Sequence, residues 1–208
     1  FFKQKTAYEI RNCDWSSDVC SSDLLIVFIG HGTARGEDVR FNLPGPDLDA
    51  VRLAEHLEDL QGRLVLVNTS SSSAAFIPML SAPNRIIITA SASAREHEFA
   101  HFGSFFSESF AAAAADRDKN GRISVLEAFE YSRREVTQRY AEAKLLQTEH
   151  PLLDDNGDGR GTLEIAKGED GGFAREVYLD ASESGAVAPA QLRLRLEARR
   201  IVTQIDEL

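Results

Sequence analysis

The sequence is poor in the residues that carry thiol and redox chemistry. Among its 208 residues there are two cysteines, one tryptophan and one methionine. Both cysteines, Cys13 and Cys20, lie in the first 24 residues, and the chain from Leu25 onward has none. Disulfide bonds, zinc–thiolate sites and a cysteine nucleophile are therefore excluded for that part of the chain.

Basic residues are also in the minority. The chain has 23 Lys and Arg against 33 Asp and Glu, a formal net charge of -10. Because so acidic a chain cannot neutralise many phosphates, we expect no nucleic-acid partner. No apolar run is long enough to cross a bilayer, and no signal peptide can be recognised. We expect no transmembrane segment, and localisation stays open, with an extracytoplasmic location as one alternative.

Residues 1–24 have neither helical nor strand periodicity. They resemble translated sequencing adapter: GAC GTG TGC TCT TCC GAT CT encodes residues 18–24, and AAG CAG AAG ACG GCA TAC GAG AT encodes residues 3–10 in the same frame. We predict that this segment is not native and that natural sequence before Leu25 is missing. The alternative is a native disordered arm. A strand here would show only that a free sheet edge pairs with an extended segment.

Three short apolar runs predict the strands of a parallel sheet. They are LIVFI (25–29), LVLV (64–67) and RIIIT (85–89). Residues 47–62 have helical periodicity, with Asp47 as the expected N-cap and Gly62 as the expected stop. The apolar face of this helix is expected to carry Leu48, Val51, Ala54, Leu57 and Leu60. The pattern predicts an α/β fold in which helices cover both faces of the sheet.

Polar residues follow the carboxyl ends of the first two strands, in GHGT (30–33) and NTSSSS (68–73). In parallel sheets this edge is where ligands bind. A nucleophile and its base often lie on neighbouring strand ends, which makes His31 and a serine of the second loop a candidate pair. The alternative is a loop histidine bonded to the main chain beside an ordinary polar loop.

This arrangement resembles the caspase and legumain group of cysteine peptidases (clan CD), and in particular bacterial legumain-like proteins of the C13 type. In that group His-Gly at one strand end is followed, one strand on, by a pattern like Asp-Ala-Cys-x-Ser-Gly. The segments FNLPGPDL (41–48) and LSAPNRIIITA (80–90) are also similar. The resemblance covers most of residues 25–165, and implies a caspase-like sheet truncated on its N-terminal side and a peptide or protein substrate.

The resemblance also implies residue roles. His31 matches the general base, Ser71 stands where the nucleophilic cysteine belongs, and Ser73 matches the motif serine; Asn68 or Thr69 replaces the aspartate. A serine hydroxyl needs a base that is itself oriented, usually by a carboxylate, and the sequence places none beside His31. Three interpretations stay open: an inactive peptidase homologue (a pseudoenzyme), a serine-dependent hydrolase using Ser71 and His31, or a different alignment of the loop.

The segment DRDKNGRISVLE (116–127) matches the calcium-binding loop of EF-hands. The expected ligands are Asp116, Asp118, Asn120, the carbonyl of Arg122, Ser124 and Glu127. Helices are expected on both sides, the second with Phe129, Val136 and Tyr140 on one face. Ca²⁺ is the predicted cofactor. The alternative is an acidic turn that only caps the second helix.

A second acidic segment, DDNGDGRGTLEI (154–165), is a weaker candidate. Asp154, Asn156 and Asp158 fit the pattern, but Ile165 stands where the closing glutamate belongs. One alternative function is a non-enzymatic calcium-binding module in which the two loops pair. Residues 25–180 are expected to form one domain. Residues 181–208 read as a linker and an amphipathic helix for packing or oligomerisation.

Overall fold

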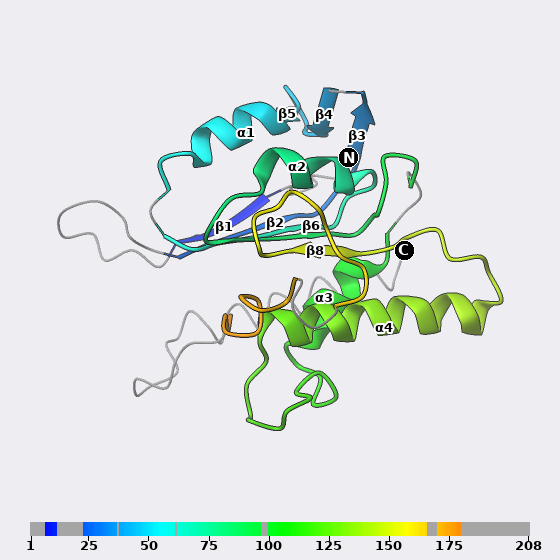
Figure 1. The fold of residues 1–208 in the computed structure, drawn as a ribbon. Coiled ribbons are helices and arrows are strands. Elements are labelled where there is room, and N and C mark those ends of the chain that lie inside the picture. Colours follow the sequence, from blue (N-terminus) through cyan, green and yellow to red (C-terminus); the bar gives the residue numbers. More distant parts are fainter. Residues whose placement is uncertain are drawn as a thin grey trace.

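The computed structural model describes residues 7–11, 23–36, 38–60, 62–96, 100–165 and 170–179. These residues form an α/β fold with a five-stranded sheet between two helical layers (Figure 1). The strand order is β1-β2-β6-β7-β8. The strands are β1 (Ala7–Arg11), β2 (Leu24–Phe28), β6 (Leu64–Asn68), β7 (Arg85–Thr89) and β8 (Leu152–Asp154). The predicted fold class is confirmed.

The centre of the sheet is parallel, as predicted. β2 pairs with β6 and β6 with β7, so that Leu25, Val65 and Ile86 lie side by side. The first strand begins at Leu24, one residue earlier than predicted, and Ile29 follows it with 43% of its surface exposed. β8 adds an antiparallel strand beyond β7. The carboxyl ends of β2, β6 and β7 therefore meet at one edge.

β1 falls within the segment that resembles sequencing adapter. It pairs antiparallel with β2 at the edge of the sheet. Main-chain pairing of this kind is open to any extended segment at a free edge, so it does not test whether residues 1–24 are native. Asp23 accepts a hydrogen bond from Arg63 Nε at 3.0 Å beside the start of β2. Residues 1–6 and 12–22 lie outside the described residues.

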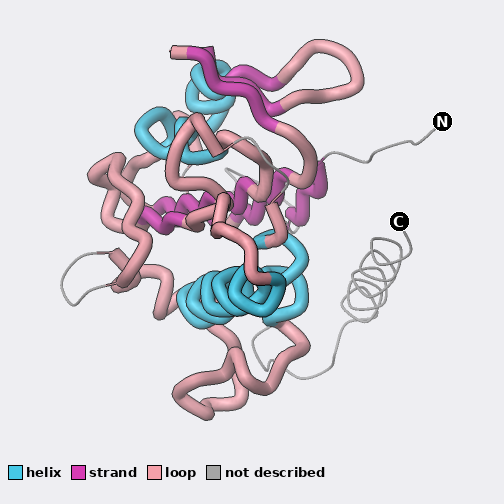
Figure 2. Tube along the Cα trace, turned by 90° about the vertical axis from the view of Figure 1, so that its right-hand side faces the viewer, coloured by secondary structure: helices cyan, strands magenta, loops and turns pink. Residues whose placement is uncertain are grey.

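Helices lie on both faces of the sheet (Figure 2), and two hydrophobic clusters hold them there. On one face, α1 (Ala50–Leu57) and α2 (Ile77–Leu80) pack with Leu64, Leu66 and Ile87. On the other, α3 (Phe102–Ser109) and α4 (Val125–Ala143) pack with Val65, Val67, Ile86 and Ile88. Alternate strand residues thus serve opposite layers. The predicted face of Phe129, Val136 and Tyr140 in α4 is buried, which confirms that helix.

The predicted bounds of the helix after residue 47 are wrong, since the helix runs from Ala50 to Leu57. A small antiparallel sheet precedes it: β3 (Gly32–Arg35), β4 (Asp38–Phe41) and β5 (Leu48–Asp49). Because Leu48 and Asp49 pair with β4, α1 starts at Ala50, and Asp49 rather than Asp47 accepts the capping bonds. Asp47 instead accepts the main-chain N–H of Leu43.

The predicted apolar face is confirmed except at one residue: Leu57 is buried, and Leu48, Ala54 and Leu60 pack against the same hydrophobic cluster. Val51 is 49% exposed, and Leu53 is buried with Leu57. None of the helices in the described part of the chain is long and apolar enough to cross a membrane. The predicted C-terminal helix lies outside the described residues.

Candidate functional sites

The fold brings the predicted histidine and serine segments together. The Ser71 hydroxyl lies 3.3 Å from the carbonyl oxygen and 3.4 Å from the main-chain nitrogen of Gly32, the residue after His31. A Cβ on Gly32 would lie 2.4 Å from the Ser71 carbonyl oxygen and 2.7 Å from Ser70 Oγ. The close approach of the two strand ends therefore needs glycine at this position.

The catalytic geometry of a hydrolase is incomplete at this contact. His31 is exposed, and its imidazole makes no hydrogen bond or ion pair within the described part of the chain. Ser71 is only 6% exposed, and its hydroxyl is engaged by the Gly32 main chain. A serine nucleophile normally bonds to an oriented base. This arrangement holds Ser71 by the main chain instead.

The other side chains of the serine loop link strand ends. Asn68 Oδ1 accepts hydrogen bonds from the Ser70 N–H at 3.1 Å and its hydroxyl at 2.6 Å. Buried Ser73 accepts the main-chain N–H groups of Ala90 and Ser91, each at 3.1 Å. Ser73 therefore joins the end of β6 to the end of β7 and does not face solvent. Thr69 donates to the Phe28 carbonyl at 2.8 Å.

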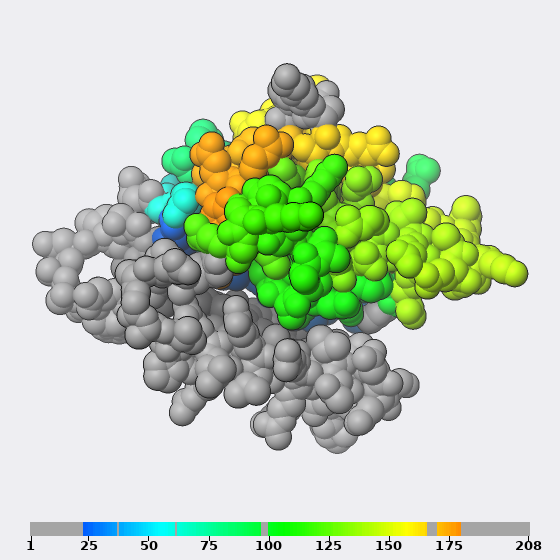
Figure 3. Space-filling model, turned by 90° about the horizontal axis from the view of Figure 1, so that it is seen from below, coloured from blue at the N-terminus to red at the C-terminus, as the bar shows by residue number. Residues whose placement is uncertain are grey.

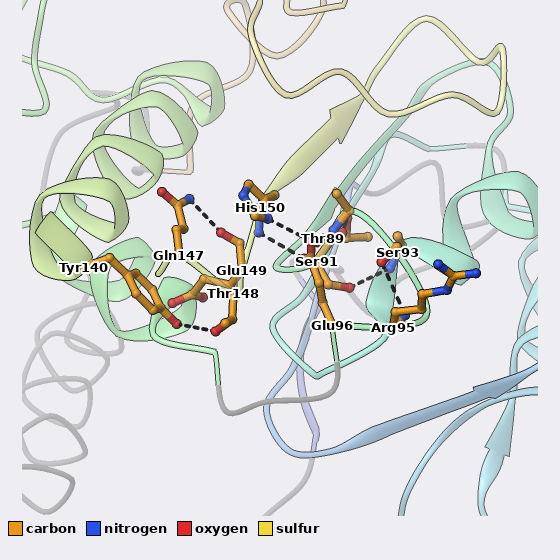
Figure 4. A network of polar contacts seen from close by, with 12 residues as sticks. Thr89, Ser91, Ser93, Arg95, Glu96, Tyr140, Gln147, Thr148, Glu149 and His150 are labelled. Atoms are coloured by element: carbon orange, nitrogen blue, oxygen red, sulfur yellow. Dashed lines mark hydrogen bonds and ion pairs between the residues drawn. The ribbon is translucent and has the colours of Figure 1, made fainter. Parts of the chain in front are cut away.

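A histidine–carboxylate pair lies at the same edge of the sheet, and sequence analysis missed it. His150 Nδ1 is 2.8 Å from Glu96 Oε1, and Figure 4 shows the two side chains facing each other between the end of β7 and the start of β8. Glu96 Oε2 also accepts the N–H groups of Ala92 and His150. The two residues are 54 positions apart, so no local pattern connects them.

Glu149, the neighbour of His150, is buried at the start of α3. Its carboxylate accepts the N–H groups of His101 at 2.9 Å and Phe102 at 3.1 Å. Burial raises the pKa of Glu149, and these two hydrogen bonds offset part of the shift. Glu149 therefore caps main-chain N–H groups at the start of this helix, which have no carbonyl partner within the helix.

The first acidic loop gathers three carboxylates. Asp116, Asp118 and Glu127 each place an oxygen so that these atoms lie within 4.8 Å of one another. Asp116 accepts the N–H groups of Asn120 at 3.1 Å and Gly121 at 2.9 Å. Lys119 and Gly121 have positive φ angles of 61° and 81°, which close the turn around these carboxylates. Within the described residues, none of the three carboxylates forms an ion pair.

Other predicted ligands have partners of their own. Asn120 Oδ1 accepts the Arg122 N–H at 2.8 Å, and its amide nitrogen donates to Asp118 Oδ2 at 2.9 Å. Ser124 is the N-cap of α4: its hydroxyl accepts the Glu127 N–H, while the Glu127 carboxylate accepts the Ser124 N–H. This capping box is the feature that the alternative of an acidic capping turn requires.

Hydrogen bonds determine the ionisation of Glu127. Burial acts to raise its pKa, but bonds from Ser124 and from the main chain of Asp118 and Arg117 outweigh burial, and the pKa lies below its usual value. A hollow of about 380 Å³ beside the loop is lined in part by Asp118 and Glu127. The charged carboxylates are thus reachable from solvent.

The C-terminal described segment covers the first loop. Ser124 forms a β-bridge with Tyr178, and Arg122 stacks over the Tyr178 ring at 3.9 Å. Figure 3 shows this segment, residues 170–179 in orange, against the green part of the chain that includes α3 and the first loop. The second loop has its own bridge, between Leu153 and Thr162. Among the described residues, no β-bridge joins the two acidic loops to each other.

The second acidic loop leaves β8 and returns as an extended segment. Asp154 Oδ1 accepts the Gly157 N–H at 3.1 Å, Asn156 accepts from Asp158 at 2.8 Å, and Asp158 accepts from Arg160 at 2.8 Å. The other oxygen of Asp154 is buried and has no hydrogen-bond partner. Next to it in the chain, Asp155 accepts the N–H groups of Gly171 and Ala174.

Asp170 lies near this loop as well. It accepts hydrogen bonds from the Asp155 N–H and the Thr162 hydroxyl. Burial raises the pKa of Asp170, the two hydrogen bonds oppose this, and the nearby carboxylates of Asp154 and Asp155 raise the pKa further. The loop region therefore groups three aspartate side chains, Asp154, Asp155 and Asp170, in a buried place.

No protein-family model matches this sequence, and no curated protein matches it. The resemblance to caspase and legumain peptidases consequently rests on the sequence motifs alone.

Proposed function

We propose that this protein binds calcium through the loop 116–127, on a caspase/legumain-like scaffold that does not hydrolyse peptides. The observation that carries the proposal is the convergence of Asp116, Asp118 and Glu127, with an oxygen of each within 4.8 Å of the others. The peptidase resemblance enters as the origin of the scaffold, with Ser71 at the place of the cysteine.

The donor set of the loop fits a hard cation. Calcium takes six to eight oxygen ligands in an EF-hand loop, from side chains, one carbonyl and a closing glutamate. Three carboxylates converge here, the Asn120 amide oxygen lies in the same turn, and the carbonyl ligand expected from the loop pattern is that of Arg122. The Ser124 hydroxyl is occupied in the helix cap, so its part in binding is to hold Glu127 in place.

Capping alone does not account for this loop. The capping box uses Ser124 and Glu127, but it needs neither Asp116 nor Asp118. Those two carboxylates add like charges beside Glu127, which costs free energy unless a cation binds. A cation would convert that repulsion into attraction, and this is the reason to favour a calcium site over a simple capping turn.

The strand ends support the absence of hydrolysis. Peptide hydrolysis by serine needs an accessible hydroxyl bonded to an oriented base. The Ser71 hydroxyl is bound to Gly32, and the exposed imidazole of His31 has no carboxylate partner in the described part of the chain. This is the arrangement expected of a pseudoenzyme.

Calorimetric titration with CaCl₂ tests the calcium proposal. The unmodified chain should bind calcium at the first loop, and Asp116→Asn should remove that binding. Asp38→Asn is a matched control, because Asp38 is exposed and pairs only with Arg40 in the described structure. Binding at the first loop that survives Asp116→Asn would contradict the proposal.

A fluorophosphonate probe, which labels reactive serines, tests the proposed absence of hydrolysis. We expect no labelling of the unmodified chain. Labelling that disappears in both Ser71→Ala and His31→Ala would establish the serine hydrolase instead.

A further inference from the structure

We propose that the segment 154–160 is a second, independent cation site, even though it lacks the closing glutamate. The inference goes beyond the first loop and does not depend on it. It rests on a buried carboxylate oxygen of Asp154 that has no partner, set in a loop whose backbone resembles that of the first site.

Asp154 is the key residue. It is only 1% exposed, and its carboxylate is directed at the loop, where Oδ1 accepts the Gly157 N–H. Its Oδ2 atom has no hydrogen-bond partner, and no ion pair to Asp154 occurs among the described residues. A buried carboxylate without a counter-charge is costly, and a bound cation is the partner that removes this cost.

The two loops share the conformation of their first half. In the first loop, positive φ angles occur at the fourth and sixth positions, Lys119 and Gly121; in the second they occur at the same positions, Gly157 at 79° and Gly159 at 75°. In both loops the third side chain accepts the N–H of the fifth residue, and the fifth accepts that of the seventh. In the first loop this conformation accompanies the close approach of the Asp116 and Asp118 oxygens. By the same geometry we infer that Asp154, Asn156 and Asp158 converge in the second loop.

The second halves of the two loops differ. After Arg160 the chain returns to Leu153 through the Thr162 bridge, and the twelfth position is Ile165, with no helix following it in the described residues. The side-chain ligands are therefore Asp154, Asn156 and Asp158. Oxygens from main-chain carbonyls and water are left to complete the coordination sphere that calcium requires. We accordingly expect weaker binding than at the first loop.

The position of the loop suggests what the ion does. Gly159 donates its N–H to Ser81 Oγ at 3.0 Å, and a Cβ on Gly157 would lie 3.2 Å from the Ala82 carbonyl carbon. The loop is thus packed on the chain that joins α2 to β7. A cation held here fastens the end of β8 to the α2 layer, which is a structural role.

Calorimetric titration of the full chain with CaCl₂ tests this site. In the Asp116→Asn background, which disables the first loop, we expect one calcium ion to remain bound. Adding Asp154→Asn should abolish that binding. Asp158→Ala should do the same and leave the fold intact, because this side chain is not buried. Glu164→Gln is the charge-matched control in the same segment and should change nothing, since Glu164 is 84% exposed at its side chain.

The outcomes of the titration are distinct. No calcium bound in the Asp116→Asn background, or binding unchanged by Asp154→Asn and Asp158→Ala, would overturn the second site. Failure of the first-loop proposal gives a different signal, namely a chain in which Asp116→Asn removes no binding at all. In the Asp116→Asn background, adding Asp154→Asn should not lower the urea midpoint in calcium-free buffer, while the calcium-induced rise of the midpoint that remains in that background should be lost; a retained rise would also contradict the inference.

Discussion

The serine loop at the sheet edge and the acidic loop before α4 differ in how their polar side chains are partnered. In the serine loop, neutral hydroxyl and amide groups bond to each other and to the main chain, and Ser70 and Ser73 are buried. In the acidic loop, Asp116, Asp118 and Glu127 lie close together, and none of them forms an ion pair in the described structure. The first arrangement is complete by itself, whereas the second groups like charges that a cation would compensate, as the calcium proposal requires.

The contrast between the two loops separates the residues that the peptidase resemblance indicates from the residues that the calcium proposal uses. A resemblance to peptidases directs attention to His31 and Ser71, yet the contacts there are those of a structural junction. The acidic loop lies on the other side of the sheet, beneath α4 (Figure 1). Its three carboxylates lie close together. Added calcium, acid and single substitutions can each perturb one of these loops without the other.

The largest effect is expected from calcium itself. At free calcium about 1,000 times the dissociation constant, binding should add about 4 kcal/mol to the free energy of unfolding. Urea unfolding in CaCl₂ and in EGTA measures this difference. Glu127→Gln keeps the size of the side chain but removes the closing carboxylate, and should eliminate most of the difference. An unaltered calcium effect in this variant would mean that calcium acts elsewhere.

On the serine side, Gly32→Ala should destabilise the protein by about 1–3 kcal/mol, because the added Cβ overlaps the main chain of Ser71. Urea unfolding measures the loss. Gly36→Ala is a useful comparison, since it has a positive φ but no atom within 4 Å of the added Cβ. If Gly32→Ala costs no more than Gly36→Ala, the close approach of the two strand ends is not a structural requirement.

Acid should weaken the acidic loop in calcium-free buffer. The pKa of Glu127 in the folded state lies below its ordinary value of 4.5. The ionised carboxylate is therefore more stable in the folded than in the unfolded chain, and its ionisation adds to the free energy of unfolding. This contribution is fully present above pH 4.5 and is lost as the pH falls through the lower folded-state pKa. Stability against urea should therefore fall less steeply with acid in Glu127→Gln. If stability falls equally steeply with acid in both proteins, the lowered pKa of Glu127 does not contribute to folding.

Asp170 should respond in the opposite direction. Its pKa is raised in the folded state, so its ionisation opposes folding at neutral pH. The cost appears as the pH rises from the ordinary value of 3.8 through the raised pKa. Asp170→Asn should hence be at least as stable as the parent at pH 7 in calcium-free buffer, because an amide can still bond with Asp155 and Thr162. A clear loss of stability would show that the charge is needed.

The smallest effect is expected for His31→Ala. The side chain is exposed and makes no hydrogen bond in the described structure, so the free energy of unfolding should change by less than about 0.5 kcal/mol. Urea unfolding provides the measurement. A loss of more than about 1 kcal/mol would instead mean that the imidazole makes a structural contact.

Features encoded by local residues are predictable from the sequence. Continuous apolar runs predict the strands 64–68 and 85–89, and the Asp and Gly spacing predicts the turn of the first acidic loop. Ser124 and Glu127 fit both a capping box and a calcium ligand set. The structure shows the hydrogen bonds of the capping box.

Features that depend on distant pairing are not predictable in this way. The start of α1 is set by the β4–β5 pairing, which moves the cap from Asp47 to Asp49. The Glu96–His150 pair is created by the juxtaposition of β7 and β8, and the bridge from Ser124 to Tyr178 by the return of the chain after the second loop. Neither contact has a local pattern that could indicate it.

The most direct test of the calcium proposal is a crystal structure of the chain grown in CaCl₂, with anomalous data to identify the ion. The proposal predicts calcium in the first loop, with oxygens of Asp116, Asp118 and Glu127 at about 2.3–2.6 Å. An empty loop at saturating calcium, with Glu127 engaged only by Ser124 and the main chain of the loop, would contradict it.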